Sequence, residues 1–224
     1  DEQYGVLDGV RENSVCLVKG PAGTGKTMLA LEETRRASAE GKTVLLACFN
    51  RPLGAWLSDA VATVPKTEAG TLHALLRARI LRSSFASEFT AAEASPSSDF
   101  YSRTFFELGA LAIHELEEKV DTILIDEVQD FPSLGLGEVI RAWISNSPSC
   151  RVVLFADFTR QALYGGRASQ DQLKAALAGL AIYNLTTNCR NTKRIAIQTD
   201  LMTGFTGTRI RDDQADGDPV EIDY

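Results

Sequence analysis

The sequence lacks a long apolar run and a recognisable export signal, and each absence excludes a class of protein. Within 224 residues, the longest stretch without Asp, Glu, Lys or Arg is about 15 residues (175–189), and it contains Asn and Thr. A membrane-spanning helix needs roughly 20 predominantly apolar residues. No basic segment followed by an apolar one, as in a secretion signal, comes after Asp1. We therefore expect neither a membrane-bound nor a secreted protein.

Cysteine is scarce, and no two cysteines form a Cys-x-x-Cys pair. The four cysteines stand at positions 16, 48, 150 and 189. Cys16 and Cys48 lie inside apolar runs that are typical of buried strands, which favours buried thiols over metal ligands. The simplest prediction is a reduced, cytoplasmic protein.

Basic residues are too few for a strongly positive surface. Lys and Arg number 23 against 30 Asp and Glu, which gives a formal net charge of -7. Residues 211–224 hold six acids and one base, a net of -5, so the rest of the chain carries only -2. A near-neutral body argues against a wide basic patch with sequence-independent affinity for DNA. A narrow groove lined by aromatic residues remains compatible with this charge.

The composition is that of a folded domain, with 44% hydrophobic residues, 17 Gly and 7 Pro. Near-continuous apolar runs, typical of strands covered on both faces, occur at 14–19, 43–49, 121–126, 150–156 and 181–185. Helical patterns lie at 28–40, 52–64, 105–120, 136–146, 171–180 and 192–202. This alternation predicts an α/β fold with a mostly parallel sheet and helices on both faces. The Ser- and Ala-rich segment 83–99 is predicted to be an exposed insertion or a mobile loop.

The segment that joins the first strand to the first of these helices reads GPAGTGKT and fits the pattern G-x-x-x-x-G-K-[ST]. Such a loop directs backbone N–H groups and a helix N-terminus at phosphate oxygens, with Lys26 reaching the β- and γ-phosphates and the Thr27 hydroxyl coordinating Mg²⁺. ATP and Mg²⁺ are thus the expected cofactors. The residues of the predicted cradle are Gly20, Pro21, Ala22, Gly23, Thr24, Gly25, Lys26 and Thr27.

Two adjacent carboxylates follow the strand TILID, in the segment DEVQD at 126–130. The carboxyl ends of parallel strands are where α/β sheets place ligands. Asp126 is predicted to hold the magnesium ion, and Glu127 to orient and deprotonate the attacking water. The alternative is that these acids only cap a helix N-terminus.

The blocks GPAGTGKT and DEVQD, in this order, resemble motifs of the superfamily 1 helicases of the UvrD/Rep type. That resemblance implies a RecA-like P-loop motor domain that couples ATP hydrolysis to movement on single-stranded DNA. It also implies that Gln3, upstream of the P-loop, hydrogen-bonds the adenine edge as in the Q motif of this family. The alternative for Gln3 is a solvated helix residue.

Two further blocks are similar to the family's DNA-contacting motifs. CFNRPL at 48–53 resembles motif Ia and assigns DNA contacts to Phe49, Asn50 and Arg51, whereas TLHA at 71–74 assigns them to Thr71 and His73. An aromatic ring at a strand end offers a face on which any base can stack. The alternatives are core packing for Phe49 and a structural histidine for His73.

The stretch 157–167 resembles motif III of the family, in which Gln161 senses the γ-phosphate. The resemblance also places Tyr164 at the nucleotide and Arg167 at the DNA. Two departures stand out: three residues separate Asp157 from Gln161 where the family has two, and Gly166 replaces a base-stacking Trp.

Asn188–Thr192 resembles motif IV, which implies that Arg190 acts as an arginine finger supplied by the same chain. Cys189 stands where relatives carry a tyrosine that stacks on adenine. The alternative for Arg190 is a surface residue that caps a helix.

Family motors contain two RecA-like domains. We therefore expect a motor domain at 1–210, with a possible small insertion or mobile loop at 83–105, and a linker with the start of a truncated second domain at 211–224. Single-stranded DNA and the second domain are the expected partners. Two alternatives remain open: a nucleotide-dependent regulatory switch that binds a protein partner without translocating, and a P-loop kinase.

Overall fold

The computed structural model describes residues 2–158, 169–190, 192–195, 197, 209–210 and 214–217. Gln161, Tyr164 and Arg167 lie outside these residues, so their predicted roles stay predictions.

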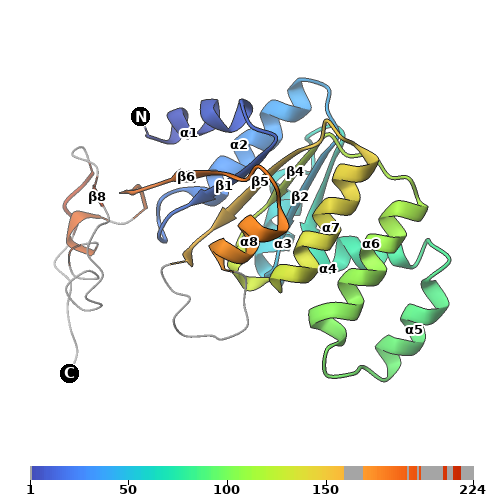
Figure 1. Ribbon diagram of the computed structural model, residues 1–224. Coiled ribbons are helices and arrows are strands. Elements are labelled where there is room, and N and C mark those ends of the chain that lie inside the picture. Colours follow the sequence, from blue (N-terminus) through green and yellow to red (C-terminus); the bar gives the residue numbers. More distant parts are fainter. Residues whose placement is uncertain are drawn as a thin grey trace, which may run out of the picture.

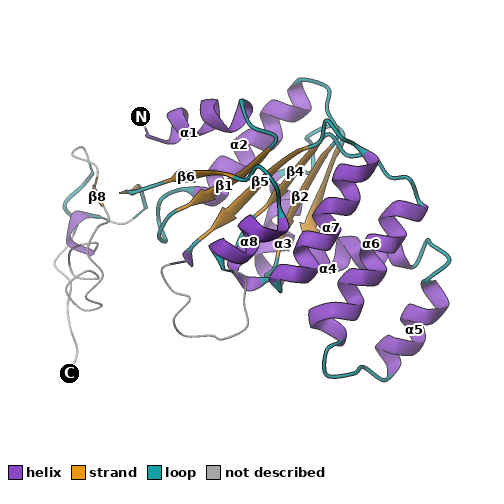
Figure 2. Cartoon of the chain, viewed as in Figure 1, coloured by secondary structure: helices purple, strands orange, loops and turns teal. Residues whose placement is uncertain are grey.

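A six-stranded sheet, parallel at every pairing, forms the centre of the molecule (Figure 2). Its strands lie in the order β3-β2-β4-β5-β1-β6. In chain order they are β1 (Val15–Lys19), β2 (Val44–Cys48), β3 (Thr67–Thr71), β4 (Thr122–Ile125), β5 (Arg151–Ala156) and β6 (Ala181–Asn184). A separate pair of short parallel strands consists of β7 (Thr187–Asn188) and β8 (Arg209–Ile210). The α/β fold with a mostly parallel sheet, as predicted, is confirmed.

Helices cover both faces of the sheet (Figure 1). One face is covered by α1 (Glu2–Arg11), α2 (Lys26–Ala39) and α3 (Arg51–Ala60). The other face is covered by α4 (Leu72–Ile80), α6 (Phe105–Glu115), α7 (Ser133–Asn146) and α8 (Gln170–Ala176), with α5 (Ala86–Ala94) beyond α6. Two short helical turns complete the described elements: the π-helix η1 (Phe100–Thr104) and the 3₁₀ helix η2 (Val128–Asp130).

The two faces of the sheet bury two separate apolar cores. Side chains alternate along each strand, so Leu17 packs into the core beneath α4 and α6, whereas Cys16 and Val18 pack beneath α1 and α2. All three of these side chains are fully buried. Burial on both faces explains why β1 reads as a continuous apolar run in the sequence.

The prediction of a mobile loop at 83–99 is wrong, because residues 86–94 form helix α5. Phe89 on this helix is fully buried, and its ring centroid lies 6.1 Å from that of Phe100. The Ser and Ala composition concealed this anchor, although Ala itself favours a helix. Whether the segment is an insertion relative to other proteins stays a prediction, as do the boundaries 1–210 and 211–224.

Strand β3 is one of the elements that the sequence patterns missed. In its sequence, TEAGT, the only apolar side chain is that of Ala69. Strand β3 lies at the edge of the sheet and pairs only with β2. An edge strand needs less apolar surface than a central one. The helix that follows it, α4, was missed with it.

The predicted burial of Cys16 and Cys48 is confirmed. All four cysteines are free, and Cys16, Cys48 and Cys150 are buried. Burial raises the pKa of the Cys16 thiol to about 11 and of the Cys48 and Cys150 thiols to about 12, which makes these thiols unreactive. Among the helices that the structure describes, none has the length and apolar character needed to cross a bilayer.

Candidate functional site

The loop between β1 and α2 adopts a conformation that requires its glycines. Gly23 and Gly25 have φ angles of 89° and 88°, in the left-handed region that glycine occupies without a steric penalty. A Cβ atom on Gly23 would also lie 2.7 Å from Asn188 Oδ1. The loop is therefore shaped both by its own backbone and by the segment that contains Asn188.

Helix α2 begins at Lys26, so its first N–H groups border the loop, where a helix terminus favours anions. The Lys26 ammonium donates to the carbonyl oxygens of Gly20 at 2.7 Å and Pro21 at 3.1 Å. Burial lowers the pKa of Lys26, and the negative charges of Asp157, Glu127 and Asp126, in this order, oppose that effect. The structure thus brings the predicted phosphate-binding lysine close to the predicted acidic residues.

Thr27 and Asp126, the two predicted metal ligands, are in direct contact. The Thr27 hydroxyl donates to Asp126 Oδ2 at 2.6 Å, and the Glu127 N–H donates to Asp126 Oδ1 at 2.9 Å. Hydroxyl and carboxylate oxygens are the hard ligands that Mg²⁺ takes, and nucleotide sites need only one or two carboxylates because phosphate oxygens supply other ligands. No group of three or more His, Cys, Asp or Glu suited to a metal occurs in the part of the chain that is described. The residues present therefore fit a magnesium ion that is shared with a nucleotide.

Asp126 has an unusual acidity because its carboxyl group is fully buried. Burial raises its pKa from 3.8 to about 6, against the opposing effect of the hydrogen bond from Thr27. A raised carboxyl pKa means that the folded state binds the proton more tightly than the unfolded state does. The contribution of Asp126 to the free energy of unfolding therefore falls as the pH rises from about 4 to about 6, and its ionised carboxylate disfavours the folded state above that range.

Asp126→Asn is expected to stabilise the nucleotide-free chain above pH 6, by about 1–3 kcal/mol, because the buried charge is removed. The amide oxygen still accepts from Thr27, whereas the amide NH2 group cannot accept from the Glu127 N–H, a loss that is the same at every pH. Thermal melts of both proteins at pH 4 and pH 8 test this: the gain should be clear at pH 8 and small at pH 4. Asp121→Asn is a suitable control, since hydrogen bonds from Thr43 lower the pKa of this exposed carboxyl group. An equal gain at both pH values would contradict the expectation.

Glu127 stands at the end of β4 with a φ angle of 55°, in the left-handed region that is unfavourable for residues other than glycine. Its side chain is held by Gln129, whose amide nitrogen donates to Glu127 Oε2. Gln129 Oε1 in turn accepts from the N–H of Asp157 at 3.0 Å. The carboxylate that is predicted to act as the base is thus oriented by a bridge from the end of β4 to the end of β5.

The segment with Asn188, Cys189 and Arg190 packs against the P-loop. The Cys189 N–H donates to the Gly23 carbonyl at 2.8 Å, and Asn188 Oδ1 accepts from the Arg190 N–H at 3.0 Å. Arg190 is close enough for its charge to contribute to the lowered pKa of Lys26. The predicted arginine finger therefore lies on the nucleotide side of the sheet.

Gln3 lies beside the same segment, since its side-chain nitrogen donates to Cys189 Sγ at 2.7 Å. Glu2 fixes this arrangement by accepting from the N–H groups of Thr186 and Thr187, each at 2.9 Å. Burial raises the pKa of Glu2, but hydrogen bonds from the side chains and the backbone of Thr186 and Thr187 outweigh it and lower the pKa overall. Gln3 and Cys189 are thus neighbours, although they lie far apart in the sequence. The family resemblance places both positions at the adenine.

The predicted DNA-contacting residues lie at the carboxyl ends of β2 and β3. Phe49 is 37% exposed, and its ring meets the His73 ring edge to face with centroids 5.4 Å apart. The Phe49 ring is therefore held by packing while part of it stays open to solvent. Asn50 and Thr71 cap helices: Asn50 Oδ1 accepts from the Leu53 N–H at 3.1 Å, and Thr71 Oγ1 accepts from the Ala74 N–H at 3.2 Å. These caps are structural roles that the motif comparison did not predict.

His73 belongs to an aromatic cluster and is a neutral side chain near pH 7. Its ring stacks on that of Phe105 with centroids 5.2 Å apart. Burial lowers the pKa of His73, and the positive charge of Arg51 adds to this effect. Arg51 is exposed at the start of α3.

The site on the described residues gathers most of the predicted positions into two groups, one at the P-loop and one at the ends of β2 and β3. The role of Gln129 was missed, because only the fold shows which two chain segments its amide joins.

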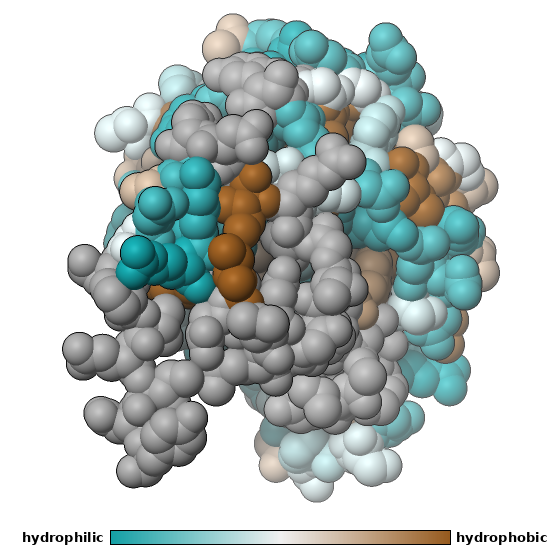
Figure 3. Space-filling view, turned by 90° about the vertical axis from the view of Figure 1, so that its left-hand side faces the viewer, coloured by the Kyte–Doolittle hydropathy of each residue, from teal (hydrophilic) through white to brown (hydrophobic). Residues whose placement is uncertain are grey.

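Seen from the side nearest β8 (Figure 3), the described surface is mainly hydrophilic, with the exposed apolar residues in a narrow strip and smaller patches. That part of the surface shows no broad apolar face.

Comparisons with known proteins show which family the chain belongs to. Residues 3–167 match a sequence family described as AAA domain. No curated protein sequence matches the chain. The solved structure of Pif1 helicase from Candida albicans is similar with a TM-score of 0.47 and 14% identity, over 82% of this chain and 39% of that one. AMPPCP-bound DnaA from Aquifex aeolicus gives a TM-score of 0.44 and 17% identity, over 91% and 52% of the two chains.

The chain therefore spans about half the length of these solved proteins or less. The predicted P-loop class is confirmed, whereas these similarities do not distinguish a UvrD/Rep-type protein from other P-loop proteins. Because the family match extends over most of the chain, this protein belongs to the AAA domain family.

Proposed function

We propose that this protein is the Mg-ATP-hydrolysing motor domain of a superfamily 1 helicase or translocase of the UvrD/Rep type. In this proposal, ATP hydrolysis drives movement along single-stranded DNA together with a second RecA-like domain. The observation that carries the proposal is the convergence of Lys26, Thr27, Asp126 and Glu127 at the carboxyl ends of β1 and β4.

The convergence supports hydrolysis of a nucleoside triphosphate. Lys26 binds the β- and γ-phosphates, and Glu127 orients a water molecule and takes its proton. Thr27 and Asp126 would hold a magnesium ion, which would supply positive charge to the phosphates. Arg190 neutralises charge on the γ-phosphate. Free and largely buried thiols support a reducing, cytoplasmic location.

The DNA side of the proposal is supported by the exposed ring of Phe49 and the adjacent guanidinium of Arg51. Both lie at the same edge of the sheet as the nucleotide site, because all strands of the sheet are parallel. An aromatic face and a cation at this edge suit a single strand whose bases are unpaired. Outside residues 211–224 the chain is near neutral, which predicts weak binding to the phosphate backbone.

The proposed second domain gives a test with the 224-residue chain. An arginine finger is typically worth about 10³–10⁵ in turnover, and in two-domain motors the partner domain supplies a further arginine. We therefore expect slow ATP hydrolysis by these residues alone, with little stimulation by single-stranded DNA. A longer polypeptide that adds the second domain should be stimulated at least about 10-fold.

Steady-state ATPase assays with and without oligo(dT) measure this, with Lys26→Ala as the blank for each polypeptide. Strong DNA-stimulated turnover by the 224 residues would contradict the need for a second domain. ATPase activity of the longer polypeptide that does not respond to DNA would instead favour a regulatory switch.

A further inference from the structure

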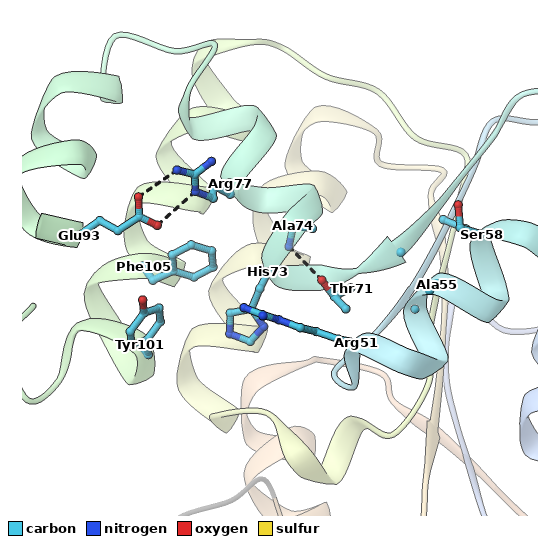
Figure 4. Close-up of a pocket in the computed structure, with 13 residues that line it drawn as sticks. Arg51, Ala55, Ser58, Thr71, His73, Ala74, Arg77, Glu93, Tyr101 and Phe105 are labelled. Carbon is cyan, nitrogen blue, oxygen red and sulfur yellow. Dashed lines mark hydrogen bonds and ion pairs between the residues drawn. The ribbon is translucent and has the colours of Figure 1, made fainter.

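A cavity of about 550 Å³ opens between α3, α4, η1 and the start of α6, and Glu93 of α5 also lines it (Figure 4). Three predicted DNA-contacting residues line it, namely Arg51, Thr71 and His73. Tyr101 and Phe105 line it as well, and the Phe105 ring stacks directly on that of His73. The volume is in the range of sites that hold small molecules or single nucleotides.

Tyr101 is the aromatic ring of this cavity with an accessible face. Its side chain is 56% exposed, while Phe105 is only 3% exposed. The Tyr101 ring is held by an edge contact with the buried ring of Phe100, at a centroid distance of 4.8 Å. It projects from a π-helical turn, a rare conformation that is frequent at functional sites. A fixed, exposed ring on a cavity wall is suited to stack on a planar group.

The charges of the cavity favour an anion. Arg51 and Arg77 contribute two guanidinium groups, and Glu93 contributes one carboxylate. Arg77 donates two hydrogen bonds to Glu93, at 3.1 and 3.0 Å. Both side chains are partly exposed, at 50% and 33%, so water screens this ion pair and makes it weak. A phosphate group has oxygen acceptors that suit a guanidinium equally well.

We propose that this cavity binds one nucleotide unit of single-stranded nucleic acid, with the base stacked on Tyr101 and the phosphate between Arg51 and Arg77. In this arrangement Glu93 competes with the phosphate for Arg77 and limits the affinity. The inference rests on the proposed function and adds to it a stacking platform from the segment between α5 and α6. It assigns binding roles to Arg77, Glu93 and Tyr101.

The test is fluorescence anisotropy of a labelled oligo(dT) titrated with the 224-residue chain at low salt. Tyr101→Ala should weaken binding about 5- to 100-fold, the usual effect of removing one stacked base contact. Tyr101→Phe keeps the ring and should bind nearly as well as the parent. Because Tyr101 is mostly exposed, both variants are expected to fold, and thermal melts check this.

Changing the charges should shift binding in opposite directions. Glu93→Gln releases Arg77 and removes a negative charge, so affinity should rise about 2- to 5-fold, in line with the strength of an exposed ion pair. Arg77→Gln should weaken binding. It should also reduce the slope of log affinity against log salt by about 0.7, the value for one phosphate contact on a single strand.

Two variants outside the cavity serve as matched controls. Arg103→Ala removes a cation that is 71% exposed in the same turn as Tyr101, and Trp56→Ala removes a ring that is 48% exposed on α3. Neither residue lines the cavity, so each variant should bind like the parent protein.

The possible results separate this proposal from the proposed function. Oligo(dT) binding by the parent that is unchanged in Tyr101→Ala and Arg77→Gln would overturn the cavity proposal and leave the proposed function standing. Equal losses in Tyr101→Ala and the two controls would also overturn it. No binding by the parent at a protein concentration of about 100 µM, the weak end of non-specific binding, would overturn the cavity proposal. The proposed function is tested separately, by DNA stimulation of ATP hydrolysis in the longer polypeptide.

Discussion

Glu127→Gln is expected to slow ATP turnover at least about 100-fold while Mg-ATP binding stays intact, because a positioned general base typically contributes 10²–10⁴-fold. The glutamine fills the same space but takes no proton from water. Glu127 has the geometry of such a base: it follows Asp126 directly, and Gln129 fixes its carboxylate. Turnover is measured by steady-state assay in the polypeptide with the second domain, and binding by calorimetric titration of Mg-ATP.

The chain offers a matched control in Glu117, which also has a left-handed backbone, with a φ angle of 47°, but lies exposed after α6. Glu117→Gln makes the same chemical change in the same backbone conformation and should leave turnover unchanged. If Glu127→Gln loses both Mg-ATP binding and turnover, Glu127 does not act only as the base, and its role is not separate from that of the P-loop in phosphate binding. If it keeps parental turnover, Glu127 is not the base.

The central strands were predictable from the sequence because strands that are buried on both faces consist mainly of apolar residues. In β4, all four residues of TILI are buried, and only apolar or compact side chains fit there. Strand β3 and helix α5 were not predictable by the same rule. Each exposes one side, so a few anchors such as Phe89 determine their position while the remaining residues are small or polar.

The nucleotide side of the candidate site was predictable because its motif is local. The spacing of glycines, Lys26 and Thr27 within one loop encodes the loop shape and the start of α2. Contacts between distant segments were not encoded in this way. Nothing in the sequence shows that Gln129 joins Glu127 to Asp157, which depends on β4 and β5 being neighbours in the sheet.

The DNA side was only partly predictable, since the motif comparison supplied Phe49 and His73 but treated the chain between α4 and α6 as a loop. Tyr101 reaches the cavity only because Phe89 and Phe100 anchor that segment against α6. Its exposure therefore results from tertiary packing and leaves no pattern in the sequence. The same packing brings Arg77 and Glu93 together across 16 positions of the chain.

Lys26→Met is expected to weaken Mg-ATP binding at least about 30-fold, because truncating one member of a desolvated charge pair costs about 2–5 kcal/mol. The nucleotide-free chain should nevertheless lose little stability. Burial lowers the pKa of Lys26, so the folded state disfavours the ammonium charge, and the free energy of unfolding contains this penalty at neutral pH. Methionine removes the charge and fills a similar volume, which offsets the two lost hydrogen bonds to Gly20 and Pro21.

Thermal melts with and without Mg-ATP separate the two effects, since a ligand at 100 times its dissociation constant stabilises a protein by about 2.7 kcal/mol. The parent should melt at a higher temperature when Mg-ATP is added, and Lys26→Met should not. Lys42→Met is the control, because this partly exposed lysine pairs only with Glu40 among the contacts described, at 3.2 Å. A melting temperature of Lys26→Met that rises with Mg-ATP as much as the parent's would show that Lys26 does not bind the phosphates. A large fall without nucleotide would show that Lys26 supports the fold, and that its buried charge is stabilised by its acidic neighbours more than burial destabilises it.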